Sequence, residues 1–137
     1  MIAIVPIRAG SKGIPNKNIK LLGGKPLVWW VLNALNNSNV NQIIVATDEE
    51  YIDLVSNFGM GLVTYLRDSI NSKDESSTED VLIEVISNLK IDDDVMLVQA
   101  TSPLTTSDDI NNGIELYKDF DSVLSVVEQK RFIWHKS

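Results

Sequence analysis

The stretch IAIVPIRAGSKGIPNKN, residues 2–18, joins an apolar run to a basic loop that contains glycine. Residues 2–7 are short, β-branched and nearly all apolar, as the buried strands of parallel sheets are. Pro6 fits such a strand only near its end. Residues 8–18 then contain one arginine and two lysines but no acidic residue. A loop of this composition directly after the first strand favours a phosphate-binding site.

Strand and helix patterns alternate along the rest of the chain. This alternation predicts a mostly parallel sheet between two layers of helices, a three-layer α/β/α fold. We expect strands at 2–7, 43–47, 62–66, 95–98 and 122–127, and helices at 26–35, 49–58, 76–89 and 107–120. Right-handed crossovers would place three polar segments at one edge of the sheet: 8–24, 67–78 and 99–106.

Two of these helices begin with capping signals. Ser76 precedes Glu79 by three residues, the spacing of a capping box. Ser107 is followed by Asp108 and Asp109, so we expect it to cap the last helix.

Composition limits the function classes. The chain has 137 residues, the size of one domain, and a net charge of −7, which disfavours nucleic acid and anionic membranes as partners. It has no cysteine and one histidine, which excludes disulfides, thiolate metal sites and histidine clusters. No apolar run approaches the roughly 18 residues of a membrane span, and no signal peptide is evident. We therefore expect a cytoplasmic protein.

The basic residues are concentrated at the start of the chain. Residues 1–47 contain five lysines and arginines, and the first acidic residue is Asp48. Gly10 and Gly13 would allow positive φ angles and close backbone approach, so that successive N–H groups form an anion-binding nest. Arg8, Lys12 and Lys17 would add positive charge. The loop matches neither a Walker A motif nor a dinucleotide fingerprint.

The opening IAIVPIRAGSKGIPNKNIKLLGGKPLVWWVLNAL strongly resembles that of the acylneuraminate cytidylyltransferases, the CMP-sialic acid synthetases. The resemblance continues through IIVATD (43–48), SSTEDVL (76–82) and QATSPLT (99–105). Enzymes that activate Kdo, pseudaminic acid and legionaminic acid share parts of these motifs. The resemblance implies a nucleotide-diphospho-sugar transferase fold, which is type A glycosyltransferase-like.

The reaction that the resemblance implies is CTP plus N-acylneuraminate giving CMP-N-acylneuraminate and pyrophosphate, assisted by Mg²⁺. The anomeric hydroxyl of a nine-carbon sugar acid would attack the α-phosphate, so positioning and charge neutralisation would dominate catalysis. Arg8 and Lys17 are the implied catalytic residues. The implied nucleotide-binding residues are Arg8, Gly10, Ser11, Lys12, Gly13, Lys17, Asn18, Arg67, Ser76, Ser77 and Thr78, and the implied sugar-binding residues are Gln99, Thr101 and Ser102.

Within this set, Asn18 would lie near the ribose, and Arg67 with residues 76–78 would frame the cytosine. Structural alternatives stand beside these roles. Ser76 is also a helix cap, and residues 101–103 also form a plausible turn. Asp48 suits a helix N-cap better than a metal ligand.

Residues 1–137 are expected to form a single nucleotide-binding domain that lacks the family's later dimerisation and metal-binding segment. The metal ligands are therefore unassigned, and Asp92–Asp94 would lie at the wrong end of a strand to supply them. A homodimer is considered because of the family's dimerisation segment. Three further hypotheses stay open: a shortened inactive homologue that binds nucleotide or protein, a sibling cytidylyltransferase for legionaminic or pseudaminic acid, and a different nucleotidyltransferase that uses another NTP.

Overall fold

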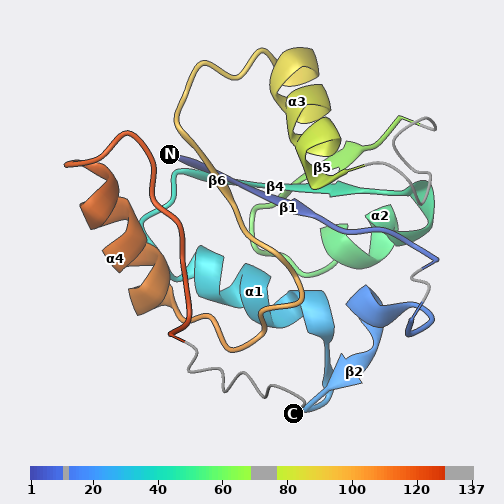
Figure 1. Ribbon diagram of the computed structural model, residues 1–137. Coiled ribbons are helices and arrows are strands. Elements are labelled where there is room, and N and C mark those ends of the chain that lie inside the picture. The colour runs from blue at the N-terminus through green and yellow to red at the C-terminus, as the bar shows by residue number, and fades with distance from the viewer. Residues whose placement is uncertain (11–12, 69–76, 129–137) are drawn as a thin grey trace, which may run out of the picture.

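The structure is a computed structural model that describes residues 1–10, 13–68 and 77–128 (Figure 1). Ser11, Lys12 and Ser76 lie outside the described residues. The helices are α1 (Leu27–Asn36), α2 (Glu49–Ser56), α3 (Thr78–Leu89), α4 (Ser107–Tyr117) and a 3₁₀ turn, η1 (Lys17–Ile19). The strands are β1 (Ile2–Pro6), β2 (Leu21–Leu22), β3 (Lys25–Pro26), β4 (Gln42–Thr47), β5 (Val63–Leu66) and β6 (Val95–Leu97).

The main sheet has the strand order β5-β4-β1-β6, and every neighbouring pair is parallel. β1 lies inside the sheet and pairs with β4 from Ile2 to Pro6, but its pairing with β6 ends at Ile4. The ladder to β4 continues beyond the strand, since the Ile7 N–H donates to the Ala46 carbonyl at 2.9 Å. Neighbouring N–H groups point to opposite sides, so Pro6 lacks its N–H on the side where pairing has ended.

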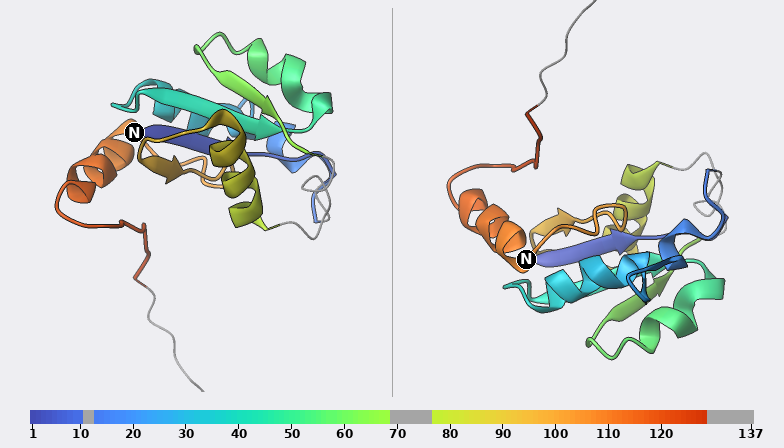
Figure 2. Two further views of the ribbon diagram at one scale, coloured as in Figure 1. Left: turned by 90° about the horizontal axis from the view of Figure 1, so that it is seen from above. Right: turned by 90° about the horizontal axis from the view of Figure 1, so that it is seen from below.

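Helices cover both faces of this sheet. Apolar residues of α1, α2 and α4 pack with one face of β1 and β4, while Val81 and Val85 of α3 pack against the other. Figure 2 shows α3 in front of the sheet from above and α1 in front of it from below. The three-layer α/β/α arrangement predicted from the sequence is confirmed.

The expected strand at 122–127 is wrong. Residues 121–128 contain no strand, and Leu124, Val126 and Val127 are each 82% exposed. Their β-branched pattern favours a strand, but a strand also needs a neighbouring ladder. Within the described part of the chain, these residues pair with no other strand.

The predicted N-cap positions of both α3 and α4 are wrong by one residue. Ser77 caps α3 and forms a capping box with Asp80, where Ser76 and Glu79 were expected. Thr106 caps α4 and forms a capping box with Asp109, where Ser107 was expected. In each case two neighbouring hydroxyl residues precede acidic residues, so the sequence offered both registers. α4 also ends at Tyr117, three residues before the predicted Phe120.

Among the described residues, no helix combines the length and the apolar character needed to cross a bilayer.

Candidate functional site

A polar cavity of about 470 Å³ opens at the carboxyl ends of the parallel strands. Its walls come from the segment after β1, the residue after β5, the N-terminal turn of α3 and the segment after β6. The lining residues are Pro6, Ile7, Arg8, Gly13, Lys17, Asn18, Arg67, Ser77, Thr78, Val81, Gln99, Ala100 and Thr101. The three polar segments expected at one edge of the sheet thus meet in one cavity.

Most of the residues singled out from the sequence line this cavity, but not all of them do. Gly10 is not among the lining residues, and Ser102 instead lines a more apolar groove beside β6 and α4. Ser11, Lys12 and Ser76 lie outside the described residues. The described lining carries three cationic side chains, Arg8, Lys17 and Arg67, and no carboxylate.

The two glycines of the loop differ in conformation. Gly10 has a φ of 72°, as expected for a glycine-dependent turn. Gly13 has no positive φ, so the expectation of a left-handed backbone there is wrong. Among the described residues of 8–18, Asn16 is also left-handed, with φ 52°, and its side-chain oxygen accepts a hydrogen bond from the Tyr51 hydroxyl at 3.1 Å. Asparagine tolerates this conformation better than most residues.

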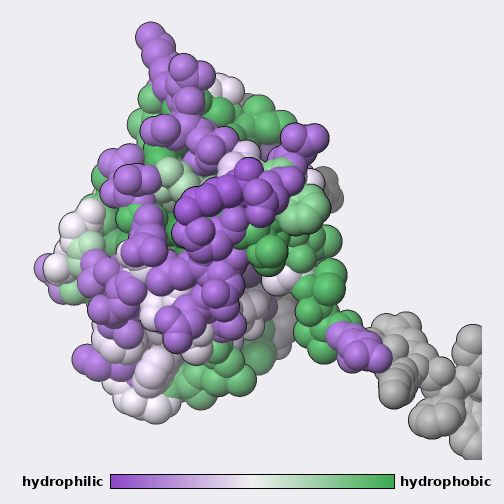
Figure 3. Space-filling model, turned by 90° about the vertical axis from the view of Figure 1, so that its left-hand side faces the viewer, coloured by the Kyte–Doolittle hydropathy of each residue, from purple (hydrophilic) through white to green (hydrophobic). Residues whose placement is uncertain are grey.

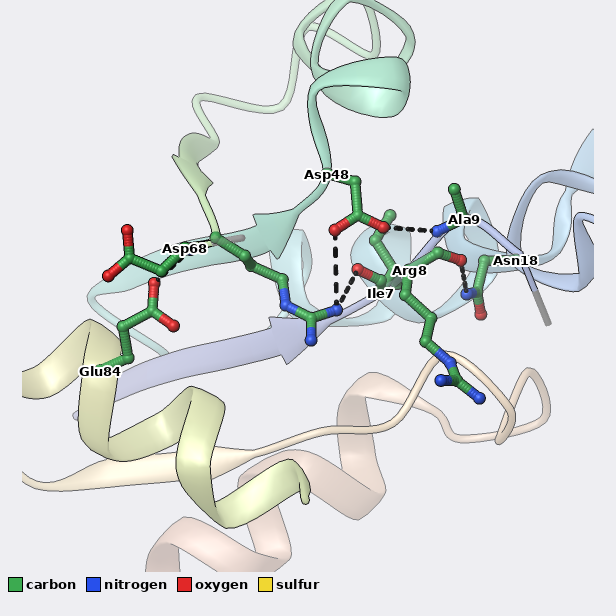
Figure 4. A network of polar contacts seen from close by, with 8 residues as sticks. Ile7, Arg8, Ala9, Asn18, Asp48, Asp68 and Glu84 are labelled. Carbon is green, nitrogen blue, oxygen red and sulfur yellow. Dashed lines mark hydrogen bonds and ion pairs between the residues drawn. The ribbon is translucent and has the colours of Figure 1, made fainter. Parts of the chain in front are cut away.

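Asn18 connects the two ends of the loop. Its side chain is buried in η1, and its Nδ2 donates to the Arg8 carbonyl at 3.0 Å. Figure 4 shows this contact, with the Arg8 side chain extending away from Asp48. The amide nitrogen of Asn18 therefore serves the loop itself, although the residue also lines the cavity.

Arg67 is buried at the cavity wall, with 7% of its surface exposed. Its Nη1 donates to the Ile7 carbonyl at 3.4 Å and lies 4.0 Å from Asp48 Oδ1. Burial lowers the pKa of the Arg67 guanidinium, while the carboxylates of Asp48 and Glu84 act in the opposite direction. One face of this guanidinium thus contacts the protein rather than the cavity.

Asp48 contacts the loop from the neighbouring strand. Its Oδ2 accepts a hydrogen bond from the Ala9 N–H at 2.8 Å (Figure 4). Asp48 occupies the N-cap position of α2, as expected, but its side chain makes no capping hydrogen bond in that fully described first turn. Sequence reasoning missed its contact with the loop; the available signal was that Asp48 is the first acidic residue of the chain and directly follows a strand.

Glu84 of α3 is a second residue that the sequence did not reveal. It is 9% exposed, and its Oε1 accepts hydrogen bonds from the Tyr65 hydroxyl at 2.9 Å and the Asp68 N–H at 2.8 Å. Burial is the main cause that raises the pKa of Tyr65. The signal was an acidic residue beside Val85 on the apolar stripe of a helix. Glu84 fixes the chain just after Arg67.

The N-terminus of α3 forms another wall. Ser77 Oγ accepts from the Asp80 N–H at 3.1 Å, and Asp80 Oδ2 accepts from the Ser77 N–H at 3.0 Å. The capping box leaves the start of the helix facing the cavity through Ser77 and Thr78. Orphan N–H groups and hydroxyls at a helix start can donate to a polar ligand.

The segment after β6 forms a turn, which was the structural alternative expected for residues 101–103. The Ser102 N–H donates to the Gln99 carbonyl at 3.1 Å, and the Thr105 N–H donates to the Ser102 carbonyl at 3.1 Å. Gln99 and Thr101 nevertheless line the cavity. The turn and a ligand-facing role are therefore compatible for these two residues.

The described residues contain no cluster of candidate metal ligands. No group of three or more His, Cys, Asp or Glu residues among them is arranged to hold a metal ion. Asp94 precedes β6 and accepts a hydrogen bond from the Tyr117 hydroxyl at 2.9 Å, which agrees with the expectation that Asp92–Asp94 lie away from the cavity. Carboxylate oxygens are the ligands that protein-bound Mg²⁺ prefers, and the described cavity lining has none.

Comparison with known proteins identifies the family. Residues 2–131 match the family described as Cytidylyltransferase. The chain belongs to this cytidylyltransferase family. This match confirms the family implied by the motifs around Arg8 and in residues 43–48, 76–82 and 99–105.

The curated relatives of this cytidylyltransferase chain include sialic-acid enzymes. It is 39% identical over 135 residues to N-acylneuraminate cytidylyltransferase A of Danio rerio, an alignment that covers 96% of this chain and 31% of that protein. It is 34% identical to N-acylneuraminate cytidylyltransferase of Streptococcus agalactiae, covering 95% of this chain and 32% of that protein. The chain thus spans about a third of the length of these relatives.

Solved structures confirm the fold of this cytidylyltransferase. A CMP:2-keto-3-deoxy-manno-octonic acid synthetase complexed with CTP superposes with a TM-score of 0.75 at 24% identity, covering 89% of this chain and 48% of that one. A 4-diphosphocytidyl-2C-methyl-D-erythritol synthase superposes with a TM-score of 0.66 at 14% identity, covering 87% of this chain and 54% of that one. The predicted nucleotide-diphospho-sugar transferase fold is confirmed.

Proposed function

We propose that this chain carries the nucleotide-binding part of an N-acylneuraminate cytidylyltransferase. In the proposed reaction, the anomeric hydroxyl oxygen of the sugar acid bonds to the α-phosphorus of CTP. The bond from that phosphorus to the β-phosphate bridging oxygen breaks, pyrophosphate leaves, and the hydroxyl proton is released. The products are CMP-N-acylneuraminate and pyrophosphate.

One observation carries the proposal: a cationic cavity at the carboxyl ends of the strands in a chain of the cytidylyltransferase family. Arg8, Lys17 and Arg67 give the described lining three positive charges without a carboxylate. Such a lining suits the negative charge of a triphosphate, and charge neutralisation is the main protein contribution to phosphoryl transfer.

The proposed residue roles are those that the resemblance to the family implies. Arg8, Lys12 and Lys17 would neutralise the triphosphate, and Gly10, Ser11 and Gly13 would approach it with their backbone N–H groups. Asn18 would lie near the ribose, and Arg67 with Ser77 and Thr78 would frame the cytosine, joined by Ser76. Gln99 and Thr101 would face the sugar acid, with Ser102 beside them.

Three accompanying expectations belong to the same proposal. Mg²⁺ is the expected cofactor, although no group of three or more His, Cys, Asp or Glu residues in the described part of the chain could hold it. A homodimer is the expected assembly because the described surface exposes large apolar side chains. A cytoplasmic location also belongs to this proposal.

A sibling sugar acid is the second candidate substrate. The chain is 34% identical over 124 residues to a CMP-N,N′-diacetyllegionaminic acid synthase of Legionella pneumophila, covering 86% of this chain and 53% of that protein. The nucleotide half of the reaction would be the same. An inactive homologue that binds nucleotide or protein is the third hypothesis.

Release of pyrophosphate tests the proposal. The protein is incubated with CTP and Mg²⁺, and N-acetylneuraminic, legionaminic and pseudaminic acids are compared as acceptors, with a chelator as control. Release that depends on N-acetylneuraminic acid supports the proposal, and release only with another acid supports the sibling enzyme. CTP binding without pyrophosphate release in the presence of any of the three acids supports the inactive homologue.

A further inference from the structure

Asp48 lies where three neighbouring strands end. β4 is between β5 and β1 in the sheet, and Asp48 is the first residue after β4. Its carboxylate reaches both neighbours: Oδ2 accepts from the Ala9 N–H at 2.8 Å, and Oδ1 lies 4.0 Å from Arg67 Nη1. Because β4 lies between β1 and β5, a residue directly after β4 can contact both Ala9 after β1 and Arg67 after β5.

The carboxylate of Asp48 is directed at the loop rather than at its own helix. An Asp at an N-cap usually accepts a hydrogen bond from the second or third N–H of the helix. In the described first turn of α2, Asp48 makes no such bond. Its side chain is 19% exposed, so its contacts lie in a partly desolvated position where they are stronger than in water.

Three consecutive residues at the entry to the loop are held by side chains that are distant in the sequence, two from neighbouring strand ends and one from the far end of the loop. Arg67 donates to the Ile7 carbonyl, Asn18 donates to the Arg8 carbonyl, and Asp48 accepts from the Ala9 N–H. These contacts fix the backbone on both sides of the Arg8 side chain, which lines the cavity. Arg67 and Asp48 also form an ion pair with each other, so two of the three side chains that contact this backbone are linked.

We propose that Asp48 is a positioning residue that, with Arg67, fixes the entry of the phosphate loop before the nucleotide binds. Asp48 does not line the cavity, so it acts through the backbone of Ala9 and the side chain of Arg67. The role in nucleotide binding rests on the proposed function. The role in holding the loop does not.

The direction of the effect separates positioning from simple electrostatics. Removal of a negative charge near a triphosphate would strengthen CTP binding if charge alone mattered. Loss of positioning would weaken it, because the loop would have to be ordered at the expense of binding energy. The two accounts therefore predict opposite signs for Asp48→Ala.

The first test measures CTP and CMP affinity by calorimetry for the wild type, Asp48→Ala and Asp48→Asn. We expect Asp48→Ala to raise the Kd for CTP about tenfold, or about 1.4 kcal/mol, and the Kd for CMP by less. Asp48→Asn should be intermediate, because its amide oxygen can still accept from Ala9. Unchanged or tighter CTP binding by Asp48→Ala would overturn the proposal.

Glu49→Gln is the matched control, since Glu49 is the exposed next residue and carries the same charge. Its Kd for CTP should stay within about twofold of the wild type, because a single exposed charge contributes little. An equal loss of CTP affinity in Glu49→Gln and Asp48→Asn would show that the effect does not depend on the contacts of Asp48 and would overturn the positioning role.

The second test needs no nucleotide. Amide hydrogen exchange by NMR should become faster at Ala9 and Gly10 in Asp48→Ala and Asp48→Asn, but not in Glu49→Gln. Unchanged exchange at both amides would overturn the hold on the loop. If the wild type bound no CTP, the proposed function and the nucleotide role of Asp48 would both fall, while faster Ala9 exchange would still support the hold itself.

Discussion

In the loop of residues 8–18, Gly10 is the glycine whose backbone conformation requires glycine. Its φ of 72° lies in the left-handed region, which disfavours a Cβ atom by about 1–2 kcal/mol. We expect Gly10→Ala to lower the free energy of unfolding by about that much. If the loop instead changes its conformation to relieve the strain, CTP binding should weaken. Chemical denaturation and calorimetry would measure the two effects.

Gly13→Ala is the control for this prediction. Gly13 has no positive φ, and an added Cβ would meet no atom within 4 Å. The substitution should therefore leave the free energy of unfolding nearly unchanged. Equal effects at Gly10 and Gly13 would contradict the assignment of the strained turn to Gly10.

At the scale of residues, the sequence located side chains that line the cavity better than side chains that support it. Arg8, Lys17 and Arg67 could be identified because motif and charge mark them. Asp48 and Glu84 could not, because their contacts join segments whose proximity depends on strand order. A local pattern carries no information on which strands become neighbours.

Two capping boxes provide a test at the scale of elements. Ser77 caps α3 at the cavity, whereas Thr106 caps α4 and is not among the residues that line the cavity. Replacement of either residue by alanine should lower the free energy of unfolding by about 1 kcal/mol. Only Ser77→Ala should also weaken CTP binding, by about 0.5–1.5 kcal/mol. Equal CTP affinities in the two variants would remove Ser77 from the proposed nucleotide site.

The cap of α4 also predicts a dependence on pH. Hydrogen bonds from the Thr106 N–H and, second, from its hydroxyl lower the pKa of Asp109. Because the folded pKa is depressed, the stabilisation is present above the unfolded pKa of about 4 and is lost as pH falls through the folded value. Thr106→Ala should reduce the loss of thermal stability between pH 5 and pH 3, as followed by circular dichroism. An unchanged pH profile would contradict this coupling.

Sequence periodicity predicted most elements of the main sheet and its helices to within a few residues. It failed at residues 122–127, where the β-branched pattern was correct for a strand but the described chain supplies no pairing partner. It also placed both caps one residue away, since Ser76 and Ser77 both precede an acid by three residues. Pairing and cap register are tertiary properties that a local pattern does not decide.

The whole molecule leaves apolar surface exposed beside β6 and α4. Figure 3 shows hydrophobic surface continuing along the segment that leads to the grey residues. We define the β6–α4 face by Leu97, Leu104, Leu116, Leu124 and Val126, of which Leu104 is 89% exposed. Contiguous apolar surface of this kind favours association.

We therefore expect self-association that increases with protein concentration and decreases in a Leu104→Ser/Leu124→Ser double variant. Sedimentation velocity over a hundredfold range of concentration would measure it. A chain that remains monomeric throughout this range would contradict the prediction and the proposed homodimer through this face.

The central claim is that the cationic cavity at the carboxyl ends of the strands is a CTP site. Nucleotide binding tests this claim most directly. CTP, UTP and ATP would be titrated by calorimetry into the wild type and into Arg8→Ala. We expect binding that prefers CTP, weakened by about 1.5–3 kcal/mol in Arg8→Ala because a charged hydrogen-bonded contact is lost. Equal binding of the three nucleotides, or CTP affinity unchanged in Arg8→Ala, would contradict the account.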